Sequence, residues 1–390
     1  MTGDLWRSTR HYSNDPGWPV LRRSRRPGGR RVATGAWIIG FPEPWSAPLS
    51  MPASQPSEPL SDRDLLDRLR HGPVSGDVLA RDSGQTRAAV WKRIQALRAA
   101  GVAIQAWPGR GYALAQPLEL LDARMILAAV PAPLRADIAG LDVAWSIDST
   151  NSELLRRPPA ASGVQVLLAE RQSAGRGRRG RSWESPLAAN MYLSLARRFD
   201  AGLARLGGLG LVAGLAVAEA LHACGLGQVR LKWPNDLVVP APDGRLLKLG
   251  GLLVEGGGEN AGPVRAVIGI GLNLRMPDQA ASGIGQPWTD VHALAGDAAP
   301  GRNRLAGECV AALLPALDRF DRNGLAPFLE RYALLDALRD RQVQIHGGDG
   351  VRTGTALGIA ADGALRVHIE GAERLVHAGE VSVRPGAGAT

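Results

Sequence analysis

The stretch Gln172-Ser-Ala-Gly-Arg-Gly-Arg-Arg-Gly-Arg181, followed by Ser182-Trp183, places three glycines and four arginines in seven consecutive positions. Glycine lets backbone N–H groups approach an anion closely, and arginine adds a positive charge that does not titrate near neutral pH. The mostly apolar run 164–169 just before it is typical of a buried strand. The stretch therefore indicates either an anion-binding loop at the end of a strand or an arginine-rich surface loop.

The composition is that of a folded, basic protein. Its 390 residues leave room for two or three domains, and 45% hydrophobic with 21% charged residues is ordinary for a globular chain. The formal net charge of +9 favours acidic partners such as DNA or nucleotides. Cys224 and Cys309 lie in apolar helical contexts, which indicates buried thiols in a reducing compartment. Because neither a signal peptide nor a convincing membrane span is evident, we expect a cytoplasmic protein with no membrane partner.

Lysine is rare in this chain. Only Lys92, Lys232 and Lys248 occur among 46 lysines and arginines. The two cations differ in geometry and hydration, so a lysine that persists in an arginine-rich chain hints that its position needs a compact ammonium group.

The first 58 residues differ in composition from the rest. Residues 1–58 are rich in Pro, Gly, Ser and Arg and have no hydrophobic period, which predicts a disordered basic tail. Such a tail either touches nucleic acid non-specifically or stays solvated. Met51 is a candidate for a later start of the chain.

Residues 59–116 predict a winged helix-turn-helix domain. Helices are expected after the capping residues Ser61 and Ser75 and over 86–99. Two short strands joined by Pro108-Gly-Arg-Gly111 add a hairpin, the wing.

A basic third helix in this arrangement is the element that reads the major groove of DNA. Arg87, Lys92 and Arg93 are expected to face outward, while the apolar residues of the helix face inward. The alternative is a small helical packing domain without DNA, but the basic helix together with the wing favours DNA binding. The candidate DNA-binding residues are Thr86, Arg87, Ala88, Lys92 and Arg110.

Residues 117–335 follow an α/β pattern. After a predicted connecting helix over 118–130, a strand over 143–147 leads into the helix start Asp148-Ser-Thr-Asn151. Hydroxyls, an amide and free backbone N–H groups at that start suit a polar ligand, although the same residues are ordinary helix caps. Further along, strand residues flank Lys232-Trp-Pro-Asn-Asp236, where proline interrupts the hydrogen-bond ladder.

Two later strands carry glycines at their centres, Gly250 and Gly251 in one and Gly269 and Gly271 in the other. Glycine inside a strand costs stability and usually marks the close approach of a ligand or of another segment. The glycines therefore indicate a sheet face kept bare for a flat molecule, or tight packing against a helix. Beyond them, five short alternating strands within 336–390 predict a small SH3-like β-barrel.

Taken in order, these motifs resemble those of biotin–protein ligases, and the N-terminal winged helix resembles that of the bifunctional form that also represses biotin-synthesis genes. The resemblance runs from about residue 60 to the end of the chain. The matching pieces are Asp148-Ser-Thr-Asn151, Gln172–Arg181, Lys232–Asp236, Lys248-Leu-Gly-Gly251 and Gly269-Ile-Gly-Leu-Asn273. The resemblance implies an α+β multidomain fold. Its parts are the winged helix-turn-helix (59–116), a central α/β mixed sheet like that of class II synthetases (117–335) and the barrel (336–390).

Ligases of this family join biotin and ATP into biotinyl-5′-AMP, release pyrophosphate and pass biotin to a lysine of a biotin carboxyl carrier protein. A carboxylate and a triphosphate must meet, so such a site needs fixed positive charge and Mg²⁺. The resemblance also implies operator DNA as a partner and a homodimer when biotinyl-AMP is bound. We expect the Gly/Arg loop to be mobile when empty and to couple ligand binding to dimerisation by ordering.

The resemblance assigns candidate roles to single residues. Lys232 and Arg178 are the catalytic candidates, with Lys232 contacting the carboxylate of biotin and the reacting phosphoryl group. The candidate biotin-binding residues are Ser149, Thr150, Asn151, Gln172, Arg176, Gly177, Arg178, Lys232, Gly250, Gly269 and Gly271. The candidate adenylate-binding residues are Gly175, Arg176, Arg178, Arg179, Arg181, Trp183, Asn235, Lys248, Asn273 and Arg384. No metal ligand is assigned, and Mg²⁺ is expected to enter with ATP.

Two alternatives stay open. A lipoate ligase shares this catalytic fold, but it lacks the Gly/Arg loop and the terminal barrel. A ligand-sensing transcription factor would bind a metabolite without ligase activity, and the retention of Lys232 together with the full loop argues against it.

Overall fold

The computed structural model describes residues 60–200, 202, 206–258, 263–347, 350–377 and 382–385. These residues belong to one compact unit that spans 55–390. The predicted disordered tail, 1–58, lies outside the described residues. Within the described ranges, no helix is both long enough and apolar enough to cross a membrane.

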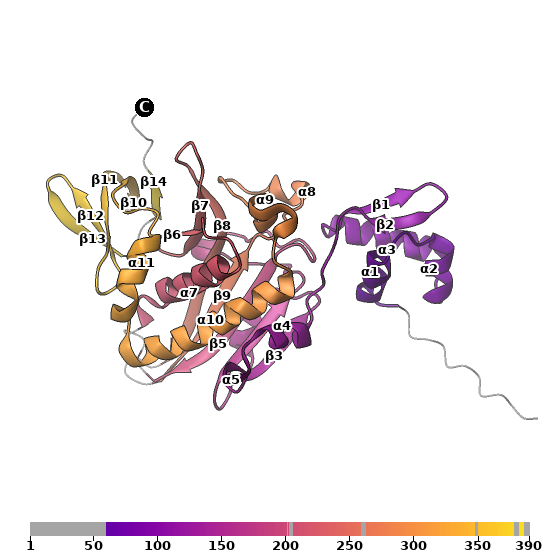
Figure 1. Cartoon of the computed structure of the whole chain (residues 1–390), viewed down its shortest axis with the longest axis horizontal. Coiled ribbons are helices and arrows are strands. Elements are labelled where there is room, and N and C mark those ends of the chain that lie inside the picture. The colour runs from indigo at the N-terminus through magenta and orange to yellow at the C-terminus, as the bar shows by residue number, and fades with distance from the viewer. Residues whose placement is uncertain are drawn as a thin grey trace, which may run out of the picture. The chain divides into compact units, whose positions relative to one another are not determined.

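The N-terminal elements form a helix-turn-helix followed by a hairpin (Figure 1). They are α1 (Asp62–Arg70), α2 (Gly76–Asp82), α3 (Arg87–Ala99), β1 (Ile104–Trp107) and β2 (Gly111–Leu114). The first two helices begin at the predicted caps Ser61 and Ser75, and Ser61 forms a capping box with Asp64. The structure adds Thr86 as the cap of α3. The strands pair antiparallel, so the predicted wing is confirmed.

Arg93 departs from its prediction. Its Nη2 and Nε both donate to Oδ1 of Asp62, at 2.7 and 2.9 Å, so the side chain ties α3 to the start of α1. The expectation that Arg93 faces outward is therefore wrong. In the sequence Arg93 follows the exposed Lys92, and the helical pattern gives no reason to bury it. Only the contact with α1 turns its side chain inward.

The central domain holds a seven-stranded mixed sheet in the order β3-β4-β5-β9-β8-β7-β6. Only β3 and β4 pair in parallel, and all other neighbours in this sheet are antiparallel. The strands are β3 (Ile138–Ala144), β4 (Val164–Ala169), β5 (Met191–Phe199), β6 (Arg230–Lys232), β7 (Asp236–Pro240), β8 (Leu246–Gly258) and β9 (Val264–Leu272). The predicted mixed sheet is thus confirmed, with β3 starting and ending earlier than the sequence suggests.

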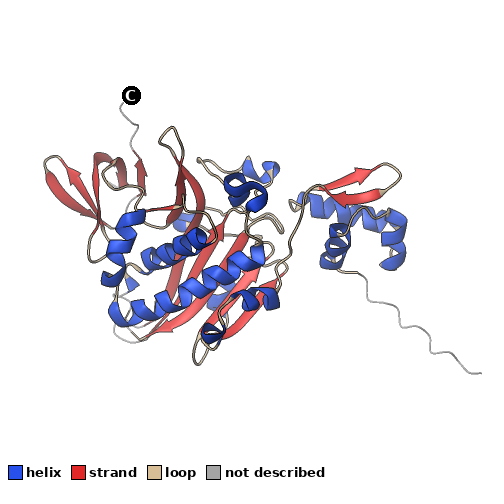
Figure 2. Cartoon of the chain, viewed as in Figure 1, coloured by secondary structure: helices blue, strands red, loops and turns tan. Residues whose placement is uncertain are grey.

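Helices cover both faces of this sheet. The helices α7 (Leu209–Ala223) and α10 (Arg302–Asn323) lie side by side over one face (Figure 2), and α6 (Thr150–Arg156) packs on the other. Along β4, Val166 belongs to the large core, whereas the next residue, Leu167, packs with Leu154 of α6. Burial on both faces explains why β4 is apolar with almost no alternation.

The predicted connecting helix over 118–130 is shorter than expected. Helix α4 covers only Ala123–Ala129, and the short α5 (Ala132–Arg135) follows. The backbone N–H of Asp122 donates to the side chain of Asn303 at 2.7 Å, while the carboxylate of Asp122 caps α4. Because residues before α4 bond to α10, they do not continue the helix backwards. The remaining helices are α8 (Asp278–Ala281), α9 (Val291–Ala295) and α11 (Leu329–Leu335).

A buried ion pair fixes this connection to the sheet. Nη1 of Arg302, the first residue of α10, lies 2.8 Å from Oε2 of Glu170 at the end of β4, and the two side chains are 9% and 0% exposed. The other oxygen of Glu170 accepts from the N–H of Leu121. Nη2 of Arg302 donates to the carbonyl of Asn190 at 2.8 Å. The pair thus joins four segments: the residues before α4, the end of β4, the residue before β5 and α10.

The C-terminal residues form a five-stranded antiparallel sheet in the order β13-β12-β11-β10-β14. Its strands are β10 (Gln342–Gly347), β11 (Gly350–Ile359), β12 (Leu365–Ile369), β13 (Ala372–Val376) and β14 (Ser382–Pro385). The buried indole of Trp233 donates from Nε1 to the carbonyl of Gly363, at 3.0 Å, in the turn before β12. The C-terminal sheet therefore supports the segment that carries Lys232.

Asp336 occupies the junction before this sheet, paired with Leu231 next to Lys232. Burial raises the pKa of its carboxyl to about 6 from 3.8, although the N–H of Leu338 donates to Oδ1 and opposes the shift. Its Oδ2 is buried without a hydrogen-bond partner among the described residues. The site therefore favours the neutral acid.

Replacing Asp336 by asparagine should remove a pH dependence of stability. A folded-state pKa above the unfolded one means that the native protein binds more protons between about pH 4 and pH 6, so its stability falls as pH rises through that window. Asp336→Asn should match wild type near pH 4 and exceed it by about 1 kcal/mol near pH 8, after a discount for partial exposure.

Urea unfolding at the two pH values measures the difference. Asp340→Asn, at a neighbouring side chain that is largely exposed, is the matched control and should follow wild type. An unchanged pH slope in Asp336→Asn would contradict the assignment.

Candidate functional site

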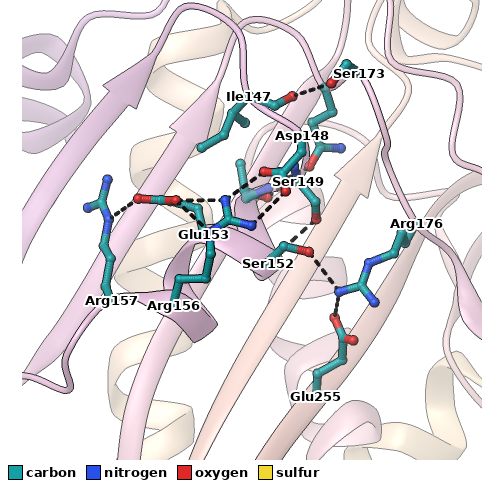
Figure 3. A network of polar contacts seen from close by, with 12 residues as sticks. Ile147, Asp148, Ser149, Ser152, Glu153, Arg156, Arg157, Ser173, Arg176 and Glu255 are labelled. Carbon is teal, nitrogen blue, oxygen red and sulfur yellow. Dashed lines mark hydrogen bonds and ion pairs between the residues drawn. The ribbon is translucent and has the colours of Figure 1, made fainter.

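The predicted polar helix start lies at the N-terminus of α6. The hydroxyl of Ser149 accepts from the N–H of Ser152, which makes Ser149 the N-cap. Asp148 accepts from both terminal nitrogens of Arg156, at 2.7 and 2.9 Å, and these bonds lower the pKa of its carboxyl to about 2. Figure 3 shows this network with Glu153, which binds Arg156 from the same helix. The charges around the helix start are thus paired and fixed.

Behind this start, Thr150 and Asn151 belong to a buried hydrogen-bond chain. Thr150 donates from its N–H and its hydroxyl to Oε1 of Gln172, at 2.9 and 3.1 Å. Ser194 of β5, fully buried, contacts the Thr150 hydroxyl at 2.7 Å and Oδ1 of Asn151 at 2.6 Å. Nδ2 of Asn151 donates to Glu255 at 2.9 Å. Strands β5 and β8, together with Gln172 after β4, therefore hold these candidates of α6 in one orientation.

The Gly/Arg stretch folds back on itself. The N–H of Gly177 donates to the carbonyl of Arg181 at 2.7 Å, and the N–H of Trp183 donates to the carbonyl of Gly175 at 2.9 Å. Arg179 adopts a φ of 58°, in the left-handed region. A ligand could meet the Gly177 N–H only if this bond breaks, so ligand binding by Gly177 stays a prediction.

Two arginines of the loop point to different partners. Arg176 donates from Nη2 to Glu255 and to Ser152, at 2.9 and 3.1 Å (Figure 3). Nη1 of Arg178 donates to Oδ1 of Asn235 at 3.0 Å. Burial lowers the pKa of the Arg178 guanidinium, and the charge of Asp236 opposes that shift. The loop is thereby linked to both α6 and the Lys232–Asp236 segment.

Asp236 holds two lysines. Its Oδ1 lies 2.7 Å from Nζ of Lys248, and its Oδ2 lies 3.8 Å from Nζ of Lys232. The two lysine side chains are only 17% and 18% exposed. Nζ of Lys248 also lies 5.4 Å from the ring centroid of Trp183, within the range of a cation–π contact. Two of the three lysines of the chain therefore share one carboxylate.

The glycine-rich strands are covered by the protein's own side chains. A Cβ at Gly271 would come 2.6 Å from the indole of Trp183, and a Cβ at Gly269 would overlap Asn151. The sheet face at these glycines is therefore not bare. The close approach that the sequence indicates is made by a loop side chain and a helix side chain. Nε1 of Trp183 is buried without a hydrogen-bond partner among the described residues.

A cavity of about 1390 Å³ joins these groups. The predicted residues that line it are Ser149, Thr150, Asn151, Gln172, Arg176, Gly177, Arg178, Arg179, Arg181, Trp183, Lys232, Asn235, Lys248, Gly269, Gly271 and Asn273. Gly175 and Gly250 lie outside that lining. Gly175 packs against Ser185, and Gly250 faces Leu272. The side chain of Arg384 lies outside the described residues, so its contact with a nucleotide stays a prediction.

The sequence did not single out three residues that organise the site, Asp236, Ser194 and Glu255. Asp236 belongs to the motif Lys232–Asp236, and its position close to one of the few lysines of the chain could have marked it as a site residue. Ser194 and Glu255 sit within ordinary strand patterns and act through side chains from elsewhere in the chain. No local signal distinguishes them.

Replacing Gly271 by alanine should push the Trp183 indole out of place. Overpacking of this kind costs about 1–3 kcal/mol, and we expect the affinity for ATP to fall roughly tenfold. Calorimetric titration of ATP in the absence of biotin measures it, since no adenylate can then form. Gly140→Ala on β3, where an added Cβ meets nothing within 4 Å, is the control. Equal affinities in the two variants would refute the packing argument.

The candidate DNA-binding residues lie on α3 and the hairpin. Thr86 caps α3 by accepting from the N–H of Ala89 at 3.2 Å. Arg87 is exposed and lies 3.1 Å from Asp77 of α2, while Ala88 and Lys92 are exposed on the same helix. The guanidinium of Arg110 lies 5.8 Å from the ring centroid of Trp107. Contacts of these residues with DNA remain predictions.

Among the residues that the structure describes, no group of three or more His, Cys, Asp or Glu side chains is placed to hold a metal ion. The titratable groups of the cavity instead combine three carboxylates (Glu184, Asp236 and Asp243) with a larger number of cations, which include two lysines and the arginines of the loop. This donor set suits the phosphates of a nucleotide.

Three family models match successive parts of the chain. The model of the biotin/lipoate A/B protein ligase family matches residues 143–273, an HTH domain model matches 62–113, and the biotin protein ligase C-terminal domain model matches 340–384. Of the solved structures, biotin protein ligase from Aquifex aeolicus in complex with biotin and ATP shares the fold. Its TM-score is 0.53 at 24% identity, over 64% of this chain and 100% of that chain.

Two curated relatives are also similar to the chain. The biotin–[acetyl-CoA-carboxylase] ligase of Mycobacterium tuberculosis is 37% identical over 62% of this chain and 88% of its own length. The bifunctional ligase/repressor BirA of Escherichia coli is 39% identical over 82% of this chain and 96% of its own length. This similarity over most of both chains, together with the three matching family models, shows that the chain belongs to the family of bifunctional biotin–protein ligases and repressors.

Proposed function

We propose that this protein is an ATP-dependent biotin–[acetyl-CoA-carboxylase] ligase that makes biotinyl-5′-AMP and transfers biotin to a lysine of a carrier protein. We also propose that it represses transcription in response to biotin. The observation that carries the ligase half is the arrangement at Asp236, which holds Lys232 and Lys248 in the same cavity as the arginine loop.

The first step brings two anions together, because the carboxylate of biotin attacks the α-phosphorus of ATP and pyrophosphate leaves. Lys232 supplies a compact positive charge near the forming bond, and the half-buried Arg178 adds a second charge. Mg²⁺ enters with ATP and offsets charge on the triphosphate. The indole N–H of Trp183 has no hydrogen-bond partner among the described residues, which supports a nucleotide on that side of the cavity.

The uncharged end of biotin needs directed hydrogen-bond partners. We assign it to the start of α6, where Ser149, Thr150 and Asn151 line the cavity together with Gln172. Their bonds to one another and to Ser194 fix the groups before a ligand arrives, which reduces the ordering that binding costs.

The second step needs no nucleophile from the protein, because the amine of the carrier lysine attacks the mixed anhydride directly. The carbonyl carbon of biotin forms the amide bond and AMP leaves with the electron pair. A biotin carboxyl carrier protein is the proposed partner. The cationic loop arginines would stabilise the departing phosphate.

The remaining parts of the proposal concern architecture. We assign the helix-turn-helix to operator DNA (domain 59–116), the class II synthetase-like domain to catalysis (117–335) and an SH3-like barrel to the C-terminus (336–390). A homodimer formed with biotinyl-AMP and a cytoplasmic location complete the proposal. Sedimentation with and without biotinyl-AMP tests the dimer, since equal masses in both states would remove the proposed coupling.

Incubation of the full-length protein with biotin, ATP, Mg²⁺ and an isolated carrier domain tests the ligase. The expected result is a mass increase of the carrier equal to one biotinyl group. A parallel reaction with lipoate tests the lipoate alternative, and modification by lipoate alone would favour it. Binding of biotin without modification of any carrier would favour the ligand-sensing transcription factor.

A further inference from the structure

The outward face of α3 carries positive charge and lacks acidic residues. The thirteen residues of α3 include no Asp or Glu. Arg93 is bound to Asp62, and Nε of Arg98 donates to the carbonyl of Ile104 at 2.9 Å, so both point away from this face. Arg87 and Lys92 remain as its exposed cations. Arg87 forms an ion pair with Asp77 in which both side chains are exposed. Such a pair contributes little stability, so a phosphate can readily replace Asp77 as the partner of Arg87.

Between these two cations stands a large apolar side chain. Trp91 lies one turn after Arg87 and directly before Lys92, and it is 56% exposed. Trp91 does not belong to the buried face of α3, which is formed by Val90, Ile94 and Leu97. Three residues earlier, Ala88 is exposed and small, so the indole is the bulkiest group on this part of the surface.

A partner for this face must satisfy both its charge and its indole. DNA offers phosphates to the two cations and, in the major groove, the 5-methyl group of thymine as its apolar feature. A recognition helix reaches base edges mainly through the residues of its first turns, where Trp91 lies.

We propose that Trp91 contacts bases in the operator, with its indole packed against thymine 5-methyl groups in the major groove. The inference rests on the DNA-binding half of the proposed function. It adds a specificity-determining residue that is absent from the sequence-based candidates. Arg87 and Lys92 then position the helix on the phosphates, and Trp91 selects thymine.

The test begins with a duplex selected from a random-sequence pool by the full-length wild-type protein with biotin, ATP and Mg²⁺. Each thymine of that duplex is then replaced singly by uracil, which removes only the methyl group. We expect wild type to lose about fivefold or more in affinity at one or two thymines of the site.

The variant Trp91→Ala completes a double-mutant cycle with the thymine-to-uracil replacements. It should bind the thymine duplex about tenfold more weakly and should no longer respond to uracil at those positions. Trp91→Gln is a second variant with a polar side chain and should behave alike. Trp107→Ala, on the hairpin, is the matched control that loses an exposed indole (44% exposed) and should keep the uracil response. Thermal unfolding and carrier biotinylation should be unchanged in all three.

Three outcomes would overturn the inference. Equal uracil penalties in wild type and Trp91→Ala would show that the methyl group meets another residue. Loss of self-association in Trp91→Ala without DNA, at unchanged DNA affinity, would assign the indole to a contact with a second copy. A wild-type protein that biotinylates the carrier yet selects no duplex would remove the DNA-binding half and this inference while leaving the ligase intact.

Discussion

Lys232→Arg should retain the positive charge and still lose at least about a thousandfold in the rate of biotinyl-AMP formation. The expectation follows from the shape of the two cations. An ammonium is a compact point charge, whereas a guanidinium is a wide planar fork that needs more room and other partners. Nζ of Lys232 lies in a confined position, 18% exposed and 3.8 Å from Asp236. The wider group would displace that carboxylate or enter the space of the reacting phosphoryl group.

Single-turnover release of pyrophosphate measures this step without the carrier. Lys92→Arg is the matched control, since it makes the same exchange at an exposed position on α3 and should keep the wild-type rate. Retention of more than a tenth of the activity by Lys232→Arg would mean that charge alone suffices. Lys232 would then lose the role assigned to it.

Arg302→Met should be the most destabilising of the substitutions considered. Removing one partner of a buried ion pair leaves the other charged and unpaired, which costs about 3–5 kcal/mol. Here Glu170 is fully buried, and the loss of the guanidinium also frees the carbonyl of Asn190. Because Glu170 accepts from the N–H of Leu121, we expect the connection before α4 to loosen first.

Urea unfolding measures the loss of stability. Arg322→Met on the same helix is the control, since its ion pair with Asp318 is exposed and should change stability by no more than about 0.5 kcal/mol. The double variant Glu170→Gln/Arg302→Met should recover part of the loss because it removes the unpaired charge. A loss below about 1 kcal/mol in Arg302→Met would contradict the buried-pair argument.

Much of the fold follows from local patterns in the sequence. The caps Ser61 and Ser75 start helices where predicted, α3 lies within the predicted range 86–99, and β4 coincides with the predicted strand over 164–169. These features depend on residues close together in the chain. The helix predicted over 118–130 failed because bonds to α10, distant in the sequence, outweigh local propensity.

The site was predictable in its residue types but not in its contacts. Glycine at 269 or 271 indicates that another group lies close to the strand, yet only the fold shows that these groups are the side chains of Asn151 and Trp183. The same limit applies to Glu255, whose carboxylate meets both Asn151 and Arg176. A side chain whose partners are distant in the sequence does not change the local hydrophobic pattern, so that pattern cannot reveal its role.

The contact of Gly271 with Trp183 also has an evolutionary consequence. A side chain at 271 pushes the indole at 183 out of place, and an indole at 183 packs well only above a glycine. Neither change is neutral by itself, so the order of substitutions matters. Across diverging members of the family, we expect these two positions to be inherited as one unit, and chains that have lost one to have lost the other.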